Sequence, residues 1–192
     1  VASTATASMK PELEKILSNH RETNLKYDCI TTVSGGKDGS YVTYNLKHKH
    51  KMNPLAITFR PMMETKLGTE NLHSFINSGY DHIHISPDVD AMRIFNKIGL
   101  IEMGFPYWGW LVGIHTSVLR MAVKMRIPLI FYSEDGDVEY GGDAKHKYKG
   151  IYGIDYQITN YVEGDYFKIL KIFSAFFQDN NIIFISVALV LL

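Results

Sequence analysis

The sequence predicts an α/β fold, namely a doubly wound, mostly parallel sheet with helices on both faces. Three observations support this prediction: short apolar runs of strand length recur, helical patterns separate them, and the segments that follow them are polar or rich in glycine. Right-handed crossovers bring the carboxyl ends of such strands to one edge of the sheet, where ligands of open α/β sheets bind.

The first part of the chain begins this alternation. Residues 27–33 are mainly apolar and predict a buried strand, which runs into the polar turn of residues 34–38. Residues 39–51 predict a helix whose basic end lies where cations suit the helix dipole. Residues 54–59 form another apolar run and predict the second strand.

The same alternation continues through residue 132. Residues 65–78 have apolar side chains at a 3.6-residue spacing, and Gly79 ends that helix. The elements that follow are a third strand, two helices and a fourth strand, at residues 82–86, 89–103, 110–124 and 128–132. Beyond residue 142 the pattern weakens, and the apolar run at residues 182–192 reads as a buried strand, a misread terminus or, least well, a membrane anchor.

Length and composition favour some classes of protein and argue against others. With 192 residues the chain is long enough for one domain with a sizeable core. Lys+Arg and Asp+Glu are equal at 20 each, which argues against a nucleic-acid partner bound through a broad basic surface. Cys29 is the only cysteine, so an intrachain disulfide is excluded. No run reaches the ~18 apolar residues of a membrane span, so we expect no membrane partner. The single cysteine and the lack of a signal-peptide pattern at residues 1–9 are compatible with a cytoplasmic protein, which is our expectation.

The most specific signal is residues 33–40, Val-Ser-Gly-Gly-Lys-Asp-Gly-Ser, between the first strand and its helix. Such a turn presents backbone N–H groups and a helix N-terminus to an anion, which makes it a phosphate site. Its glycines permit close backbone approach, its serines add hydroxyl donors and its lysine offsets phosphate charge. The nucleotide-binding candidates of this loop are Ser34, Gly35, Gly36, Lys37, Asp38, Gly39 and Ser40.

A carboxylate beside an anion implies a cation, so Asp38 predicts Mg²⁺. Residues 133–142 follow the fourth strand and hold four carboxylates, of which Glu134 is nearest the strand and is the second metal candidate. Gly141 and Gly142 would let backbone approach the ligand. The alternatives are an acidic surface turn at this segment, and a polar turn capped by Asp38 or Ser40 at the loop.

Other candidates lie at the same edge of the predicted sheet. Thr58, Phe59 and Arg60 end the second strand, where adenine and ribose would lie; Arg60 has a structural role as its alternative. His115 is a candidate proton shuttle. Two further features, His82 with His84 and the aromatic residues 105–110, are assigned to packing, with a metal site and stacking on a ligand as their alternatives.

Several segments together resemble the N-acetyl sugar amidotransferase family, pyrophosphate-loop enzymes of surface-polysaccharide and lipopolysaccharide biosynthesis that are related to those of pseudaminic acid. The resemblance covers residues 27 to about 170. The matching segments are VSGGKDGSY at 33–41, NPLAIT at 53–58, LGTENL at 67–72, GYDHIHISP at 79–87, GFPYWG at 104–109 and IPLIFYSEDGDVEYGG at 127–142.

The resemblance implies an adenine-nucleotide alpha-hydrolase-like (HUP-type) fold and an ATP pyrophosphatase reaction. ATP would adenylylate the N-acetyl oxygen of a nucleotide sugar, and ammonia from a glutaminase subunit would then displace AMP. ATP and Mg²⁺ are the implied cofactors, and Lys37, Asp38 and His115 the catalytic candidates. The implied division is an N-terminal extension at residues 1–26, the ATP-binding domain at residues 27–150 and a truncated C-terminal segment at residues 151–192.

Two departures from the family pattern keep alternatives open. The first 26 residues lack the cysteine-rich segment that members commonly carry, and members are nearly twice this length. Many pyrophosphate loops also have serine where Gly39 stands, so Ser40 would supply the hydroxyl instead. The alternatives are a tRNA-modifying enzyme that uses the same loop and an ATP-binding module without catalysis.

Overall fold

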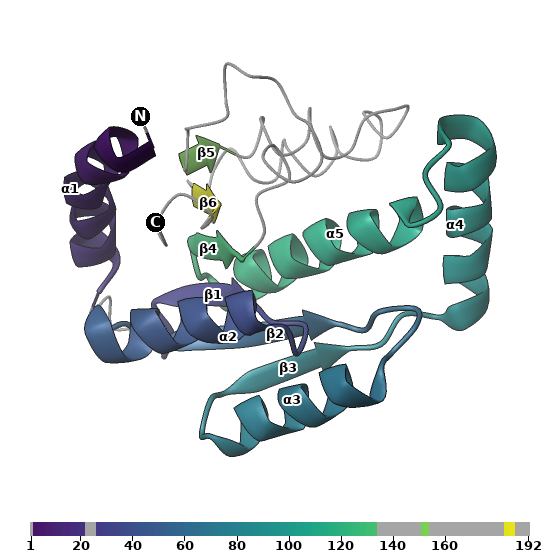
Figure 1. The fold of residues 1–192 in the computed structure, drawn as a ribbon, viewed down its shortest axis with the longest axis horizontal. Coiled ribbons are helices and arrows are strands. Elements are labelled where there is room, and N and C mark those ends of the chain that lie inside the picture. The colour runs from purple at the N-terminus through teal and green to yellow at the C-terminus, as the bar shows by residue number, and fades with distance from the viewer. Residues whose placement is uncertain (1, 22–25, 134–150, 154–182, 187–192) are drawn as a thin grey trace.

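The computed structural model describes residues 2–21, 26–133, 151–153 and 183–186, and within them the predicted α/β fold is confirmed (Figure 1). The strands are β1 (Cys29–Thr32), β2 (Pro54–Phe59), β3 (His82–Ile85), β4 (Leu129–Tyr132), β5 (Ile151–Gly153) and β6 (Ile183–Ser186). The helices are α1 (Ala2–His20), α2 (Lys37–Tyr44), the π-helical turn η1 (Asn45–Lys49), α3 (Lys66–Asn77), α4 (Val89–Met103) and α5 (Trp108–Met125).

The sheet is mostly parallel and has the strand order β3-β2-β1-β4-β6-β5. β1 pairs with β2 on one side and with β4 on the other, and only β5, among the described strands, runs antiparallel to its neighbour. Ile30 stands in register with both Leu55 and Ile130. Because the chain builds outward from β1 first through β2 and later through β4, the topological switch point lies between β1 and β4.

Helices cover both faces of the sheet, as the doubly wound prediction requires. Ile30, Ile57 and Ile130 are buried with residues of α5 in the core of one face. The opposite face buries Cys29 and Phe131 beneath α1, α2 and η1, and the β2 end of that face packs on α3. Alternate residues of each strand therefore enter different cores, as the two-residue period of a strand dictates.

Most predicted elements match, and β2 and α4 match to the residue. The helix expected at residues 39–51 begins earlier and changes to π-helical geometry at Asn45. α1 lies within the expected N-terminal extension, yet Leu13 and Leu17 are buried in the same core as β1 and β4. β5 and β6 place parts of residues 151–192 in the one sheet, next to β4.

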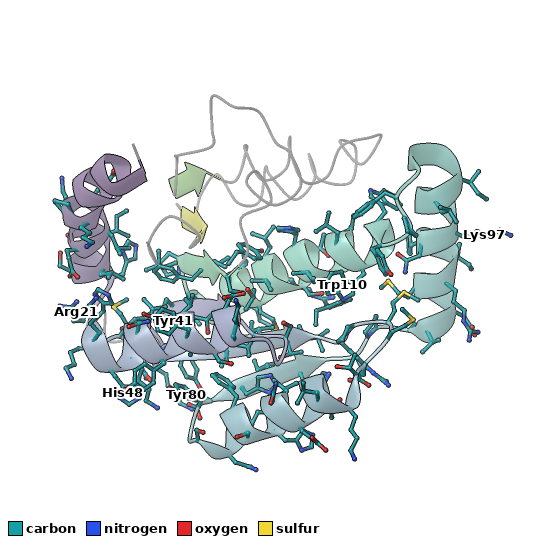
Figure 2. All side chains as sticks on the ribbon, in the orientation of Figure 1. Arg21, Tyr41, His48, Tyr80, Lys97 and Trp110 are labelled. Carbon is teal, nitrogen blue, oxygen red and sulfur yellow. The ribbon has the colours of Figure 1, made fainter. Side chains whose placement is uncertain are left out.

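The basic end of the α2–η1 segment is bound to a neighbouring turn. Lys47 Nζ donates to the Gly79 carbonyl oxygen at 3.0 Å and lies 4.7 Å from the centre of the Tyr80 ring. His48 lies beside the same ring, as Figure 2 shows. These contacts give Lys47 and His48 a structural role at the end of this segment. Separately, no helix among the described residues is long and apolar enough to cross a membrane.

Candidate functional site

The loop that follows β1 lies at the switch point, beside the end of β4. The Ser133 N–H donates to Thr32 Oγ1, and Ser133 Oγ donates to the Thr32 carbonyl oxygen, both at 3.4 Å. On the other side, the Val33 N–H donates to the Ile57 carbonyl oxygen at 3.0 Å. The loop is thus held on both sides by neighbouring strands just where ligands of open α/β sheets bind.

Gly35 is the conformational centre of this loop. Its φ is +86°, in the left-handed region where side chains are strained. A Cβ atom there would overlap the Gly68 carbonyl oxygen and lie 3.0 Å from the Gly68 carbonyl carbon. Gly35 therefore brings the loop into backbone contact with the first turn of α3, which only glycine allows.

Gly36 has a different role, because it is the N-cap of α2 and provides no side-chain cap. Its φ of −80° and ψ of 168° are ordinary extended values. Among the described residues, Ser34 Oγ at 3.5 Å is the only atom within 4 Å of a Cβ built there. The described residues therefore leave open space above Gly36, and the α2 N-terminus has no capping side chain, as in helix N-termini that receive an anion.

Ser40 and Gly39 have structural roles in this loop. Neither Asp38 nor Ser40 caps α2; instead, Ser40 Oγ donates to the Gly36 carbonyl oxygen at 3.0 Å. Gly39 is buried, and a Cβ atom there would lie 2.6 Å from the Thr32 carbonyl oxygen. Gly39 therefore serves close packing of α2 on β1, and a serine would not fit here. The exposed residues of the loop are Ser34, Gly36, Lys37 and Asp38.

Thr58 connects the loop to β3 through two hydrogen bonds. Its buried hydroxyl donates to the carbonyl oxygen of Val33, the first residue of the loop, and lies 2.8 Å from His82 Nε2. A hydroxyl has one proton, and Thr58 donates it to Val33. The Thr58 oxygen can therefore only accept from His82, which places a hydrogen on Nε2. Burial and the nearby His84 lower the pKa of His82, which favours the neutral imidazole.

Thr58→Val is expected to lower the free energy of unfolding by about 1–3 kcal/mol, because it leaves the Val33 carbonyl and His82 Nε2 without their partner. Urea unfolding monitored by circular dichroism measures this change. Thr58→Ser keeps the hydroxyl and should recover most of the loss. Equal destabilisation by serine and valine would show that the methyl group, not the hydrogen bonds, carries the effect.

The two other residues predicted at the end of β2 differ in position. Phe59 is buried, and its ring lies against Gly113 of α5, so its side chain belongs to the core. Arg60 is exposed at the sheet edge and pairs with Glu64, Nη2 to Oε2 at 3.0 Å. Of the two, Arg60 is the residue that a ligand at this edge could contact.

His115 lies in the core on the α5 face of the sheet. Its ring is 4.8 Å from that of Tyr132, centre to centre, and it is 9% exposed. Burial lowers the pKa of His115 to about 4, so the imidazole is neutral at pH 7. A neutral buried ring is poorly suited to deliver a proton near neutral pH, which favours a packing role over the predicted shuttle.

The same pKa predicts a pH dependence of stability. Unfolded histidine binds a proton below pH ~6.5 while folded His115 stays neutral to about pH 4, so the stability present above pH 6.5 is lost as pH falls through this window. The loss attributable to His115 is about 3 kcal/mol, at ~1.4 kcal/mol per pKa unit. Urea unfolding of wild type and His115→Gln between pH 4 and 7 measures it. A variant that keeps the full pH slope would contradict this assignment.

Trp108, His82 and His84 make the packing contacts that the sequence predicts for them. Trp108 is buried, and its ring centre lies 6.4 Å from that of Phe95 on α4. His82 bonds to Thr58 as described, and its ring meets that of His84 at 6.0 Å, edge to face. Within the described residues, no group of three or more His, Cys, Asp or Glu side chains is arranged to hold a metal.

The metal and glycine candidates after β4 remain predictions. Glu134, Gly141 and Gly142 lie outside the described residues. Asp38 is exposed in the first turn of α2, beside the open space above Gly36.

Sequence reasoning missed two features of the site, the Gly68 backbone contact and the Thr58–His82 bond. Neither has a local signal, because each joins residues far apart in the chain.

Comparisons with known proteins support the fold. No family model matches the chain. An uncharacterized protein of Methanocaldococcus jannaschii is 41% identical over 63 residues, which are 33% of this chain and 23% of that protein. Among solved structures, the NH3-dependent NAD synthetase of Campylobacter jejuni has a TM-score of 0.50 at 14% identity, over 74% of this chain and 61% of that one. It supports the predicted HUP-type fold.

Two further solved structures are similar. The U34-tRNA thiolase NcsA of Methanococcus maripaludis has a TM-score of 0.46 at 16% identity, over 72% of this chain and 52% of its own. A predicted subunit of a tRNA methyltransferase from Methanocaldococcus jannaschii has a TM-score of 0.46 at 17% identity, over 82% and 66%. This chain thus spans between about half and two thirds of each of these solved structures.

Proposed function

We propose that this chain is the ATP-binding part of an enzyme that splits ATP into AMP and pyrophosphate, and that this enzyme is an N-acetyl sugar amidotransferase. The observation that supports the first part is the uncapped N-terminus of α2 at the switch point of the sheet, where the described residues leave open space above Gly36. The sequence resemblance described above supports the second part.

The loop has the chemistry to hold a pyrophosphate. The N–H groups of the first turn of α2 supply donors and the positive end of a helix dipole. Lys37 is exposed beside them and can neutralise phosphate oxygens, and Ser34 can add a hydroxyl. These groups stabilise the negative charge that develops when pyrophosphate leaves.

Asp38 is a carboxylate that would hold a magnesium ion bound together with ATP. Such ions usually take one or two carboxylates from the protein and their other ligands from phosphate and water, so a full protein cage is not needed. The Asp38 carboxylate is exposed and does not cap α2. The ion would offset phosphate charge, and we propose Glu134 as its second carboxylate.

The proposed reaction has two steps, adenylylation of the N-acetyl oxygen and displacement of AMP by ammonia. First, the amide oxygen of the N-acetyl group attacks the α-phosphorus of ATP, the bond to the β-phosphate oxygen breaks, and pyrophosphate leaves. Ammonia then adds to the carbonyl carbon of the adenylylated N-acetyl group. AMP leaves with the former amide oxygen, and an acetamidino group remains. The substrate is a nucleotide sugar, and we propose that a glutaminase subunit supplies the ammonia.

The first step can be tested without ammonia. With ATP, Mg²⁺ and an N-acetyl nucleotide sugar, radioactive pyrophosphate should exchange into ATP, and the exchange should depend on the sugar. Adding ammonia should convert the exchange into net release of AMP. Release of ADP and phosphate would refute the pyrophosphatase assignment.

Other outcomes of this assay separate the alternatives. Exchange that requires tRNA in place of the sugar would contradict the amidotransferase and favour a tRNA-modifying enzyme. ATP binding without exchange under any condition would identify a nucleotide-binding module that lacks catalysis. The sugar with its acetyl group removed is the matched control substrate, because it lacks the reacting oxygen.

A further inference from the structure

His82, at the start of β3, is connected to the loop that follows β1 by two successive side-chain hydrogen bonds. Its Nε2 lies 2.8 Å from Thr58 Oγ1, and the Thr58 hydroxyl donates to the Val33 carbonyl oxygen. His82 is half-buried, and Thr58 is 1% exposed. A buried hydroxyl bond is commonly structural, but this one ends on the backbone of the proposed ATP site.

The sheet holds both side chains of this connection in place. In the register of β2 and β3, Ala56 stands opposite His82 and Thr58 opposite His84. The His82 ring therefore reaches two residues along the strand, and it meets the ring of His84 edge to face. Because His82 donates to Thr58 and Val33 accepts from it, the Thr58 hydroxyl is fixed in one orientation.

The Thr58 hydroxyl fixes the direction of the last strand-like peptide before the loop. The Val33 N–H donates to the Ile57 carbonyl oxygen at 3.0 Å, and the Val33 carbonyl accepts from Thr58. Both backbone groups of Val33 therefore face β2. With these two bonds in place, the Val33 peptide cannot rotate without losing a hydrogen bond.

This direction determines where the next N–H group points. The Val33–Ser34 peptide is trans, so the Ser34 N–H lies on the opposite side of the chain from the Val33 carbonyl. β1 stands between β2 and β4, so this N–H points to the β4 side, which is the switch point. The Thr32 carbonyl faces the same side, where it accepts from Ser133 Oγ.

We propose that Thr58 and His82 are positioning residues of the ATP site, which hold the Val33–Ser34 peptide so that the Ser34 N–H donates to a phosphate oxygen. This inference rests on the proposed ATP-binding function. A donor that already points to the ligand binds it more tightly, because no ordering cost is left for the binding step. Neither side chain needs to touch ATP itself.

Isothermal titration calorimetry with Mg-ATP tests the proposal. Thr58→Val should weaken binding about tenfold, and His82→Leu about threefold because the bond from Thr58 to Val33 remains. Thr58→Ser keeps the hydroxyl and His82→Gln keeps a side-chain N–H donor, so both should bind nearly as wild type does. Circular dichroism checks that each variant is folded at the temperature of the titration.

Tyr27→Phe is the matched control for a merely structural effect. The Tyr27 hydroxyl donates to Asp81 Oδ2 at 2.8 Å, just before β1 and β3 begin, at the opposite edge of the sheet. The variant therefore also loses a hydroxyl bond between these parts of the sheet, and it should lose stability without losing affinity for ATP.

Nuclear magnetic resonance observes the peptide directly. Val33–Ser34 is the only Val–Ser pair in the sequence, so valine labelled with ¹³C at its carbonyl and serine labelled with ¹⁵N give a single signal that joins the two. Loss of a hydrogen bond shields a carbonyl carbon, so Thr58→Val should move the Val33 carbon signal upfield even without ATP. Mg-ATP should move the Ser34 amide proton of wild type downfield.

The possible failures can be told apart. Equal ATP affinity of wild type, Thr58→Val and His82→Leu would overturn the positioning role, as would an equal loss in Tyr27→Phe. Wild type that binds no Mg-ATP would refute the proposed function together with this role. An unchanged Val33 carbon signal in Thr58→Val would contradict the hydrogen bond itself, whether or not ATP binds.

Discussion

Replacing Gly35 with alanine is expected to lower the free energy of unfolding by about 3–5 kcal/mol, the largest effect of any single substitution in the loop. A φ of +86° alone costs an alanine roughly 1–3 kcal/mol. The added Cβ would also overlap the Gly68 carbonyl oxygen, and backbone on both sides must move to relieve it. Urea unfolding of wild type and variant measures the change.

Gly36→Ala is the matched control for this substitution. The neighbouring glycine has ordinary backbone angles and open space where its Cβ would lie, so its alanine variant should unfold within about 1 kcal/mol of wild type. If both alanine variants had equal stability, the contact between the loop and α3 would not constrain Gly35. If Gly36→Ala alone were destabilised, the two glycines would have exchanged their assigned roles.

Gly36→Val is expected to weaken ATP binding by at least tenfold, or ~1.4 kcal/mol, while leaving the stability of the chain nearly unchanged. Valine accepts the extended backbone of this residue, so the fold is retained. Its branched side chain would fill the open space above the α2 N-terminus, where the proposed phosphates approach. Isothermal titration calorimetry with Mg-ATP measures the affinity.

Lys124→Val tests whether this loss is local. Lys124 is an exposed residue in the last turn of α5, which leads into the amino end of β4, away from the loop. Its variant should bind ATP as wild type does. Unchanged binding by Gly36→Val would contradict a phosphate site at this helix N-terminus, and it would do so without reference to any sugar substrate.

The parts of the fold that sequence predicted well are those with a local physical cause. β2 is a continuous apolar run between turn residues, and α4 has a cap at Asp88 and a left-handed glycine, Gly104, at its end. α1 was missed because its small polar N-terminal residues give little periodicity. Its place is fixed instead by the burial of Leu13 and Leu17, a tertiary contact.

The same distinction between local causes and tertiary contacts applies to the candidate site. The loop could be recognised because its glycines, lysine and aspartate are contiguous between a strand and a helix. The separate roles of the glycines could not be predicted, because the role of Gly35 depends on its contact with α3 and that of Gly39 on its contact with β1. Likewise, His115 has no local signal that distinguishes a catalytic from a core histidine, and its burial, which favours the core role, is a tertiary property.

Cys29 offers a way to time the opening of the strand that carries the loop. It lies in β1 with no exposed surface, and burial, followed by the nearby Asp28, raises the pKa of its thiol. An alkylating reagent therefore reaches a reactive thiolate only when β1 separates from its covering helices. The alkylation rate thus reports how often this part of the sheet opens. A ligand that binds only the closed form should slow alkylation by the factor 1 + [L]/Kd, so one thiol measures both opening and occupancy.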